Sequence, residues 1–442
     1  MQAVDPAGVG KQGASRGGVS LSKQVQPVRG MNDVLPEQIG AWQHLEQVLR
    51  GLLASYGYEQ MQLPVLEHTE LFRRGIGELT DIVEREMYSF TDTGGESLTL
   101  RPEATAGVVR AAISNGLLRG ARLKLWCAGP MFRHERPQKG RYRQFHQVSI
   151  EALGFAGADI EAELIALTAR LWRTLGISRV RLLINSLGST AARQAYRARL
   201  IEYFSAHQAE LDEDSRRRLA GNPLRILDSK NPAMQALIGA APLLTEHLDE
   251  GSREQFATLC ATLEALGIPY AINPRLVRGL DYYSGTVFEW VTDALGAQDA
   301  VCAGGRYDGL IELLGGEPTP GIGCAMGIER VAELLSQAGT VPPAAPPAVY
   351  LIASGARAER EALCLAERLR EALPGRSVLV NLGGGNFKNQ FRRADKSGAF
   401  VALILGEEEL ERGVAAVKPL RATAGQSEYP LAEVPARIAA LF

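Results

Sequence analysis

Residues 132–147 read Phe-Arg-His-Glu-Arg-Pro-Gln-Lys-Gly-Arg-Tyr-Arg-Gln-Phe-His-Gln. Short apolar runs lie on either side, at Leu123–Met131 and Val148–Leu153, and a Pro137–Gly140 turn interrupts the middle. Two strand-length apolar runs around a turn predict an antiparallel hairpin. Against one anion, Glu135, its loop carries five cations, namely Arg133, Arg136, Lys139, Arg141 and Arg143. Cations held in place on a hairpin suit polyphosphate and nucleic acid.

The segments around the hairpin predict an α+β domain built on an antiparallel sheet. A helix is predicted over Pro36–Tyr56, because apolar residues recur at helical spacing, proline occupies the first turn and Gly57 follows the end. Another helix is predicted over Ile160–Leu175. Consecutive strands that do not alternate strictly with helices favour antiparallel pairing. Besides the hairpin, we predict strands at Tyr58–Gln62, Leu98–Leu100, Val180–Asn185, Thr286–Val291 and Ala300–Ala303.

Two other segments organise the chain. Residues 190–265 are almost wholly helical in pattern and predict a helical insertion, whose charge runs are typical of solvated helix faces. Residues 339–347 are rich in proline and predict an extended linker. The first domain is therefore expected at 23–338, behind a disordered tail at 1–22 that is rich in Gly, Ser and Ala.

Strands and helices alternate after the linker, so residues 348–442 are predicted to form a small α/β domain with a largely parallel sheet. The strands are expected at Ala348–Ala353, Ser377–Asn381 and Phe400–Leu405. The helices are expected at Ala356–Leu373 and Phe387–Lys396. The second helix carries a local basic patch of Lys388, Arg392, Arg393 and Lys396.

Composition limits the classes of function. The formal net charge of −2 over 442 residues argues against binding nucleic acid with the whole surface, so local patches must carry any such contact. The five cysteines are far apart and lack zinc-site spacing, which favours a reduced, cytoplasmic protein without a protein-bound metal. No apolar run approaches the roughly 18 residues of a membrane span, and no secretory signal is visible.

Polar residues gather where the predicted strands end. Glu103 and Thr105 follow a strand and precede a helix, a position at which a helix cap is the favoured interpretation. Gln147, Ser149 and Glu151 share one face of the second hairpin strand. Because its surroundings are apolar, Glu151 needs a partner, which a substrate cation or imidazole would supply.

Three more segments are dense in glycine and polar groups. Residues 277–286 place Arg278, Asp281, Tyr282 and Tyr283 between glycines, and we favour a functional interpretation over a turn held by an Arg–Asp pair. Residues 303–309 read Ala-Gly-Gly-Arg-Tyr-Asp-Gly. In Gly321–Arg330 the glycines are spaced GxGxxxG without an obvious preceding strand, so we reject a dinucleotide site and expect them to open a helix from which Arg330 points to a ligand.

If a nucleoside triphosphate binds to this chain, arginines must hold its phosphates. The chain contains no Walker A lysine loop, no HExxH and no GxSxG elbow. A guanidinium group is always charged and binds phosphate with two parallel hydrogen bonds.

These segments, in this order, resemble a class II aminoacyl-tRNA synthetase, and specifically the histidyl-tRNA synthetase family. Residues 29–64 resemble the first class motif, at the dimer interface, while the hairpin resembles the second and Gly321–Arg330 the third. The histidine-specific signatures Arg-Gly-Leu-Asp-Tyr-Tyr at 278–283 and Ala-Gly-Gly-Arg-Tyr-Asp at 303–308 are more specific. The resemblance spans residues 25–442 and implies a catalytic first domain, a C-terminal anticodon-binding domain and a homodimer.

The resemblance also implies a reaction. Histidine would attack the ATP α-phosphate to give histidyl-adenylate and pyrophosphate, and the acyl group would pass to the 3′ end of tRNA-His. Magnesium is implied only as the companion of ATP. Imidazole recognition by hydrogen bonds makes an editing domain unnecessary.

Site roles follow from the same resemblance. The catalytic residues would be Arg133 and Arg278, which would hold the α-phosphate. Arg133 would also lie at the substrate carboxylate, and Arg278 would stabilise the charge that builds up at the phosphate. Other ATP-binding residues would be Arg141 and Arg330 at the β- and γ-phosphates and Phe145 on adenine. Other histidine-binding residues would be Glu103, Thr105 and Gln147 at the α-amino group, and Glu151, Tyr282 and Tyr283 around the imidazole. Arg136 would approach the acceptor end of the tRNA, and Lys388, Arg392 and Arg393 its anticodon stem-loop.

Two alternatives remain at this point. A histidine-sensing regulatory subunit of ATP phosphoribosyltransferase resembles the synthetase core, but typically lacks the C-terminal domain and has an eroded Arg278 segment. A synthetase for another amino acid is disfavoured by residues 278–283.

Overall fold

The computed structural model describes residues 25–78, 80–138, 140–227, 229, 231–296, 300–423 and 425–442. The predicted disordered tail, 1–22, and Lys139 of the hairpin loop lie outside the described residues. The chain divides into two compact units, one ending at Val341 and the other running from Pro342 to Phe442. The boundary falls inside the proline-rich stretch. No helix of the described chain is long and apolar enough to cross a membrane.

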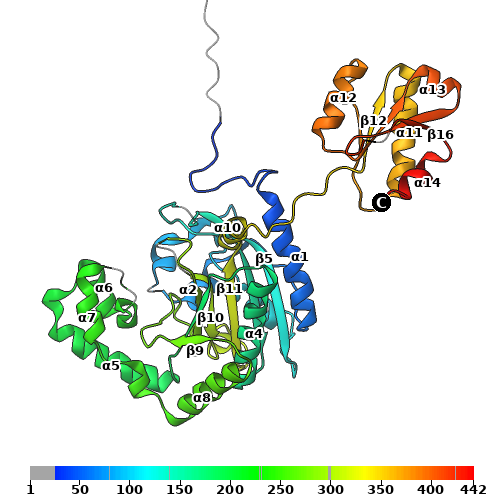
Figure 1. Cartoon of the computed structure of the whole chain (residues 1–442). Helices are drawn as coiled ribbons and strands as arrows, with labels where there is room; N and C mark the ends of the chain where they lie inside the picture. Colours follow the sequence, from blue (N-terminus) through cyan, green and yellow to red (C-terminus); the bar gives the residue numbers. More distant parts are fainter. Residues whose placement is uncertain are drawn as a thin grey trace, which may run out of the picture. The chain divides into compact units, whose positions relative to one another are not determined.

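An eight-stranded sheet forms the centre of the first unit (Figure 1). Five consecutive pairings in it are antiparallel and only those at the two edges are parallel, which confirms the predicted α+β fold. In spatial order the strands are β1 (Glu59–Gln60), β5 (Leu123–Phe132), β6 (Gln144–Leu153), β11 (Gly321–Gly327), β10 (Ala300–Arg306), β9 (Ser284–Val291), β7 (Arg181–Ser186) and β8 (Tyr270–Ile272). The predicted hairpin is β5 and β6, paired over ten residues each.

One prediction for this sheet is wrong. The glycines of Gly321–Gly327 do not open a helix but lie in β11, and the helix α10 (Ile328–Ala338) begins after them. They allow close packing within the sheet. A Cβ at Gly323 would overlap the Glu151 carboxylate, and one at Gly304 would collide with the backbone oxygen of Gly323.

Helices cover one face of the sheet, because their apolar stripes pack together in a single core. They are α1 (Ile39–Ser55), α4 (Ala158–Thr174), α8 (Glu250–Ala265) and α10. Leu45 and Leu49 of α1 and Leu164 and Leu171 of α4 are almost fully buried there. The opposite side carries α2 (Thr69–Ile76), η1 (Ile82–Glu86), α3 (Thr105–Ser114), α9 (Leu310–Leu313) and a small sheet of β2 (Leu66–His68), β4 (Ser97–Leu100) and β3 (Tyr88–Thr91).

The segment between β7 and β8 is helical, as its pattern predicts. It contains α5 (Thr190–Ala206), α6 (Glu213–Ala220), α7 (Gln235–Ala240) and α8, joined by the short 3-10 turns η2 (Gln208–Glu210), η3 (Pro223–Ile226), η4 (Pro232–Met234) and η5 (Leu244–His247). Tyr196, Leu200 and Phe204 of α5 are fully buried in a core that also includes Tyr282 and Tyr283. We call residues 190–265 the insertion. Its core is thus continuous with that of the loop preceding β9.

The second unit is an α/β domain around a five-stranded sheet, which confirms its predicted class. Its order is β13 (Val378–Val380), β12 (Val349–Ala353), β14 (Val401–Leu405), β15 (Val414–Pro419) and β16 (Ser427–Pro430). Helices α11 (Ala356–Ala372) and α14 (Val434–Ala439) share one core, while α12 (Phe387–Lys396) packs against side chains of the other sheet face.

The predicted largely parallel sheet is wrong for this unit. Strand β12 pairs in parallel with β13 and β14, but β14/β15 and β15/β16 are antiparallel. Only residues 406–413, with the short helix α13 (Glu407–Glu411), join β14 to β15. A parallel crossover needs about a dozen residues or more, so the chain returns in the opposite direction.

Candidate active site

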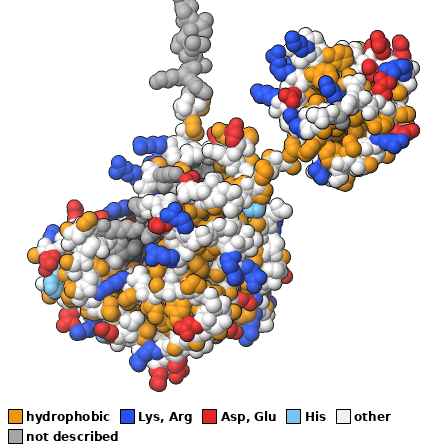
Figure 2. Space-filling model, viewed as in Figure 1, with side chains coloured by type: hydrophobic (Ala, Val, Ile, Leu, Met, Phe, Trp, Pro, Cys, Tyr) orange, Lys and Arg blue, Asp and Glu red, His pale blue; other side chains and the backbone are white. Residues whose placement is uncertain are grey.

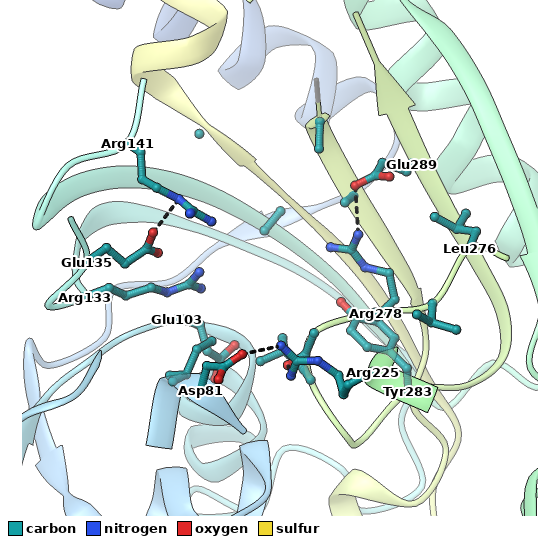
Figure 3. Close-up of a pocket in the computed structure, with 18 of the residues that line it drawn as sticks. Asp81, Glu103, Arg133, Glu135, Arg141, Arg225, Leu276, Arg278, Tyr283 and Glu289 are labelled. Atoms are coloured by element: carbon teal, nitrogen blue, oxygen red, sulfur yellow. Dashed lines mark hydrogen bonds and ion pairs between the residues drawn. The ribbon is translucent and has the colours of Figure 1, made fainter. Parts of the chain in front are cut away.

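A cavity of about 1130 Å³ opens on the sheet face opposite α1 and α4. The hairpin, the N-terminus of α3, strands β10 and β11, the loop before β9 and the insertion all contribute to its wall. Figure 3 shows Arg133, Arg141 and Arg278 converging on it from the hairpin and from the loop before β9. Such a concentration of guanidinium groups suits an anionic ligand.

At the N-terminus of α3, which also faces the cavity, the helix-cap interpretation is confirmed for Glu103, whereas the Thr105 hydroxyl donates to Glu151 instead. The Glu103 carboxylate accepts hydrogen bonds from the backbone N–H groups of Thr105 at 2.6 Å and Ala106 at 2.9 Å. Burial raises the pKa of Glu103 and these hydrogen bonds oppose the rise. Both Glu103 and Thr105 line the cavity, so the cap and a ligand-binding role are compatible.

Glu151 lies fully buried in a network of hydroxyl groups. The Thr105 hydroxyl donates to Glu151 Oε1 at 2.7 Å, and the Tyr307 hydroxyl donates to Oε2 at 2.5 Å. Burial raises the pKa of Glu151 to about 8, against the lowering effect of these two hydrogen bonds. The expected need of Glu151 for a partner is therefore met within the chain, by these two hydroxyl groups.

Strand β6 places unpaired polar atoms along the cavity, and the loop between β5 and β6 places cations there. The Arg133 guanidinium donates to Pro102 O at 2.9 Å and lies 5.3 Å from the centre of the Phe145 ring. Arg141 forms an ion pair with Glu135. Gln147 Oε1 and Ser149 Oγ are buried without a hydrogen-bond partner among the described residues. Buried polar atoms of this kind are available to a ligand.

The loop before β9 brings Arg278, Tyr282 and Tyr283 to the same cavity. Arg278 donates to Glu289 Oε1 at 3.0 Å and lies 5.9 Å from the centre of the Tyr283 ring. The rings of Tyr282 and Tyr283 have centres 4.7 Å apart. Burial raises the pKa of Tyr283 to about 12, so its hydroxyl keeps its proton at neutral pH.

Arg330 lies at the start of α10 and lines the cavity, where it joins two elements. It donates to Gly140 O of the hairpin turn at 3.1 Å and to Ala300 O of β10 at 2.5 Å. The neighbouring Glu329 accepts from the His146 backbone N–H at 2.8 Å. The two residues thereby hold the hairpin against the helix.

Some predicted residues are not among those that line this cavity. Arg136 is exposed on the hairpin loop and does not line it. Lys388, Arg392 and Arg393 are exposed on α12 of the second unit, and Figure 2 shows blue side chains gathered on that side of the unit. Arg393 also donates to Asn381 Oδ1 at 3.0 Å.

Sequence reasoning missed several residues of the site. Tyr307 belongs to the signature at 303–308, but no role was predicted for it. Glu289 could have been found from the sequence, because it is an acid inside the apolar run Thr286–Val291. Asp81, Asn222 and Arg225 carried no local signal, and only the fold brings them to the loop of Arg278. Within the described residues, no group of three or more His, Cys, Asp and Glu could hold a metal ion.

Comparisons with known proteins agree with this geometry. The family model described as Histidyl-tRNA synthetase matches residues 30–331, and the model described as Anticodon binding domain matches residues 348–441. The crystal structure of the apo histidyl-tRNA synthetase of S. aureus is similar, with a TM-score of 0.79 and 33% identity over 94% of this chain and 100% of that one.

Two more distant structures share the fold. A histidyl-tRNA synthetase from Nostoc sp. PCC 7120 has a TM-score of 0.65 at 20% identity, covering 95% of this chain and 100% of that one. A Bacillus halodurans protein described as an ATP phosphoribosyltransferase regulatory subunit/histidyl-tRNA synthetase has a TM-score of 0.62 at 23% identity, covering 84% and 97%.

Proposed function

The chain belongs to the histidyl-tRNA synthetase family, and from this premise we propose that it is a histidine–tRNA ligase. It activates L-histidine with ATP to give histidyl-adenylate and pyrophosphate, and then transfers the histidyl group to the 3′ end of tRNA-His. The observation that carries the proposal is a single cavity in which arginines face a buried network of acid and hydroxyl groups. The arginines suit the phosphates of ATP, and the acid and hydroxyl groups suit an amino acid with a polar side chain.

The arginines supply the phosphate-binding part. Arg133 and Arg278 bind the α-phosphate, where negative charge builds up as the histidine carboxylate attacks, and fixed cations there lower the barrier. Arg141 and Arg330 bind the β- and γ-phosphates, and Phe145 stacks on adenine. Magnesium enters with ATP and needs no dedicated protein site.

The acid and hydroxyl part binds histidine. Glu103, Thr105 and Gln147 bind the α-amino group at the N-terminus of α3. Tyr282, Tyr283 and Glu151 surround the imidazole. Glu151 acts on it through the hydroxyl groups of Thr105 and Tyr307, to which it is hydrogen-bonded. A site that hydrogen-bonds a substrate N–H rejects analogues without one by about 10⁴-fold or more.

The remaining partners follow from the other surfaces. Arg136 on the exposed hairpin loop contacts the acceptor end of tRNA-His, and the basic side of α12 contacts the anticodon stem-loop. The active protein is a homodimer that uses residues 29–64, as the family resemblance implies.

Pyrophosphate exchange tests the proposal. The protein is incubated with ATP, labelled pyrophosphate and each amino acid in turn, and we expect histidine alone to support exchange. Charging of tRNA-His with histidine then checks the second step. Exchange with a different amino acid and none with histidine would refute the assignment.

The similarity to the Bacillus halodurans protein supports one second candidate, a histidine-sensing regulatory subunit of ATP phosphoribosyltransferase. The matched anticodon-binding domain favours the ligase, because a regulatory subunit has no need to bind an anticodon. Calorimetric histidine binding without any pyrophosphate exchange, together with stimulation of ATP phosphoribosyltransferase, would favour the regulatory role.

A further inference from the structure

The insertion makes direct polar contacts with the loop that carries Arg278. We call residues 277–283 the Arg278 loop. Arg225, on η3 of the insertion, donates from Nη1 to Gly279 O at 2.9 Å. Asn222, just before η3, donates from Nδ2 to Asp281 Oδ1 at 2.6 Å. Arg193 on α5 donates to the backbone oxygen of Tyr283. The insertion therefore contacts the loop at three residues, Gly279, Asp281 and Tyr283.

A segment of the first unit holds the other side of the same loop. The Asp281 backbone N–H donates to Ile76 O at 3.1 Å, and Gly77, with a φ of +105°, leaves room for the Asp281 side chain. Asp81, which follows, accepts from Arg225 Nη2 at 2.9 Å and from Arg218 Nη2 at 3.2 Å. Figure 3 shows the Arg225–Asp81 pair on the cavity side. The Arg278 loop is thus held between Ile76 and Gly77 on one side and the insertion on the other, and Asp81 in turn holds Arg225 of the insertion.

Arg225 donates hydrogen bonds to two acceptors at once. Its side chain is only 14% exposed, and its two terminal nitrogens bind a backbone oxygen and a carboxylate on different segments. A planar guanidinium reaches both acceptors with two donors that are fixed in one rigid group. Truncation would remove this donor from the part-buried oxygen of Gly279 and leave Asp81 with the hydrogen bond from Arg218.

The Arg278 loop has no regular structure of its own. Residues 277–283 form neither helix nor strand, so backbone ladders do not fix their conformation. Side-chain contacts from outside the loop decide where such a segment lies. Arg278 and Tyr283 on this loop both line the cavity, at positions that depend on these contacts.

We propose that Asn222 and Arg225 of the insertion are positioning residues that hold the Arg278 loop in the ligand-binding conformation. Arg225 also lines the cavity, and both residues act on the loop through Gly279 and Asp281. The insertion is therefore coupled to histidine activation. This inference rests on the proposed function for its kinetic consequence, while its structural part stands independently of the reaction.

Hydrogen–deuterium exchange of the full chain without ligands tests the structural part. In Asn222→Ala and Arg225→Ala, we expect the exchange rate of peptides covering 277–283 to rise about tenfold, as a loss of about 1.4 kcal/mol of local stability implies. Arg216→Ala is the matched control, because Arg216 is an exposed arginine of the insertion whose hydrogen bonds end on Gln208 and Ala209. Equal protection of these peptides in all variants would overturn the proposal.

Exchanging the amide of Asn222 and the carboxylate of Asp281 tests the contact between them with almost no change in composition. Asn222→Asp places a carboxylate against that of Asp281, and we expect it to lower kcat/KM for histidine in pyrophosphate exchange about tenfold or more. Adding Asp281→Asn restores an amide–carboxylate pair with the donor reversed, and we expect most of the loss to be recovered. Recovery would show that the first change acted through its contact with Asp281, because the second change cannot repair a general loss of folding. Failure of the rescue would count against the proposal.

The two layers of inference can fail separately. If the unaltered chain does not catalyse pyrophosphate exchange with histidine, the proposed function fails. The hydrogen–deuterium exchange result still decides whether the insertion holds the loop. If the unaltered chain catalyses pyrophosphate exchange but Asn222→Asp and Arg225→Ala leave kcat/KM for histidine unchanged, only the positioning role is overturned.

Discussion

The individual side chains of the cavity depend on partners that are distant in the sequence. Glu151 is held by Thr105 and Tyr307, and Arg278 donates to Glu289 on the neighbouring strand. Burial keeps a proton on Glu151 at neutral pH, since its pKa rises to about 8. A neutral carboxyl group can then donate as well as accept a hydrogen bond.

The protonation of Glu151 predicts a pH dependence of stability. Its pKa is about 8 in the folded chain, against 4.5 for the ordinary group, so between these values the folded state holds a proton that the unfolded state releases. The free energy of unfolding should therefore decrease as pH rises from 4.5 to 8, by at most about 1.4 kcal/mol per pH unit. Glu151→Gln stays neutral and should lose this slope.

Urea unfolding at pH 5.5 and pH 7.5 measures the effect. All four tryptophans precede Val341, so their fluorescence reports on the first unit alone. We expect Glu151→Gln to gain stability relative to the unaltered chain at the higher pH. Glu254→Gln on the exposed side of α8 is the control and should show no such gain. A constant difference between the Glu151 variant and the unaltered chain would contradict the prediction.

Arg278 predicts a catalytic effect. Removing a fixed cation from the site of developing charge typically costs about 10²–10³ in rate, so we expect Arg278→Ala to slow pyrophosphate exchange by that factor. Arg278→Lys should recover only part, because one ammonium group cannot replace the planar fork. Arg119→Ala, an exposed change outside the cavity, serves as the control. Exchange at an unchanged rate in Arg278→Ala would rule out the role.

At the scale of elements, the hairpin separates its cations by position. Arg133 and Arg141 line the cavity, whereas Arg136 is exposed on the connecting loop. All three lie in the loop between Phe132 and Gln144. There the Arg133 N–H donates to Arg143 O and the Arg141 N–H donates to Gln138 O, and these backbone hydrogen bonds fix the division. A single basic segment can thus serve two ligands.

This division predicts opposite effects of two similar substitutions. Arg136→Ala should lower the rate of histidyl transfer to tRNA about tenfold, the cost of one charge-assisted hydrogen bond, and leave pyrophosphate exchange within about twofold. Arg141→Ala should instead raise the KM for ATP in the exchange reaction. Single-turnover transfer from preformed adenylate, beside steady-state exchange, separates the steps. Parallel losses of both steps in Arg136→Ala would argue against the division.

At the scale of the whole molecule, the chain consists of two units with separate cores. The first unit contains the cavity, and the second matches an anticodon-binding domain. In the second unit, α12 and α11 pack on opposite faces of one sheet. The basic face of α12 is therefore separated from the cations of α11 by the sheet.

The α12 patch predicts a salt-dependent contribution to tRNA binding. Replacing Lys388, Arg392 and Lys396 together by Ala should weaken binding of tRNA-His and reduce the slope of log K against log salt by about one for each phosphate that the patch neutralises. Pyrophosphate exchange should not change. Arg357, Arg360 and Arg368 on α11 provide a matched triple control of equal charge. If both triple variants show the same slope as the unaltered chain, this patch does not bind the tRNA.

Much of the fold was predictable because its signals are local. The apolar runs of β5, β6 and β9, the helical spacing of α1 and α4, and the extent of α12 are all visible in short windows of sequence. The strand β11 was mistaken for the start of a helix, since glycines in a strand are explained only by the residue across from them, Glu151. The antiparallel half of the second sheet likewise depends on a short connection.

By itself, the sequence determined the two fold classes, the family and the residue types of the site, because spacing and composition carry that information. Only the tertiary structure decided which groups pair. Thr105 and Glu151 are 46 positions apart, Glu151 and Tyr307 are 156 apart, and Arg225 and Asp81 are 144 apart. No local pattern encodes such distances. The packing of the sheet, α3 and the insertion around one cavity brings these groups within hydrogen-bonding range, and that proximity sets their charge and their orientation.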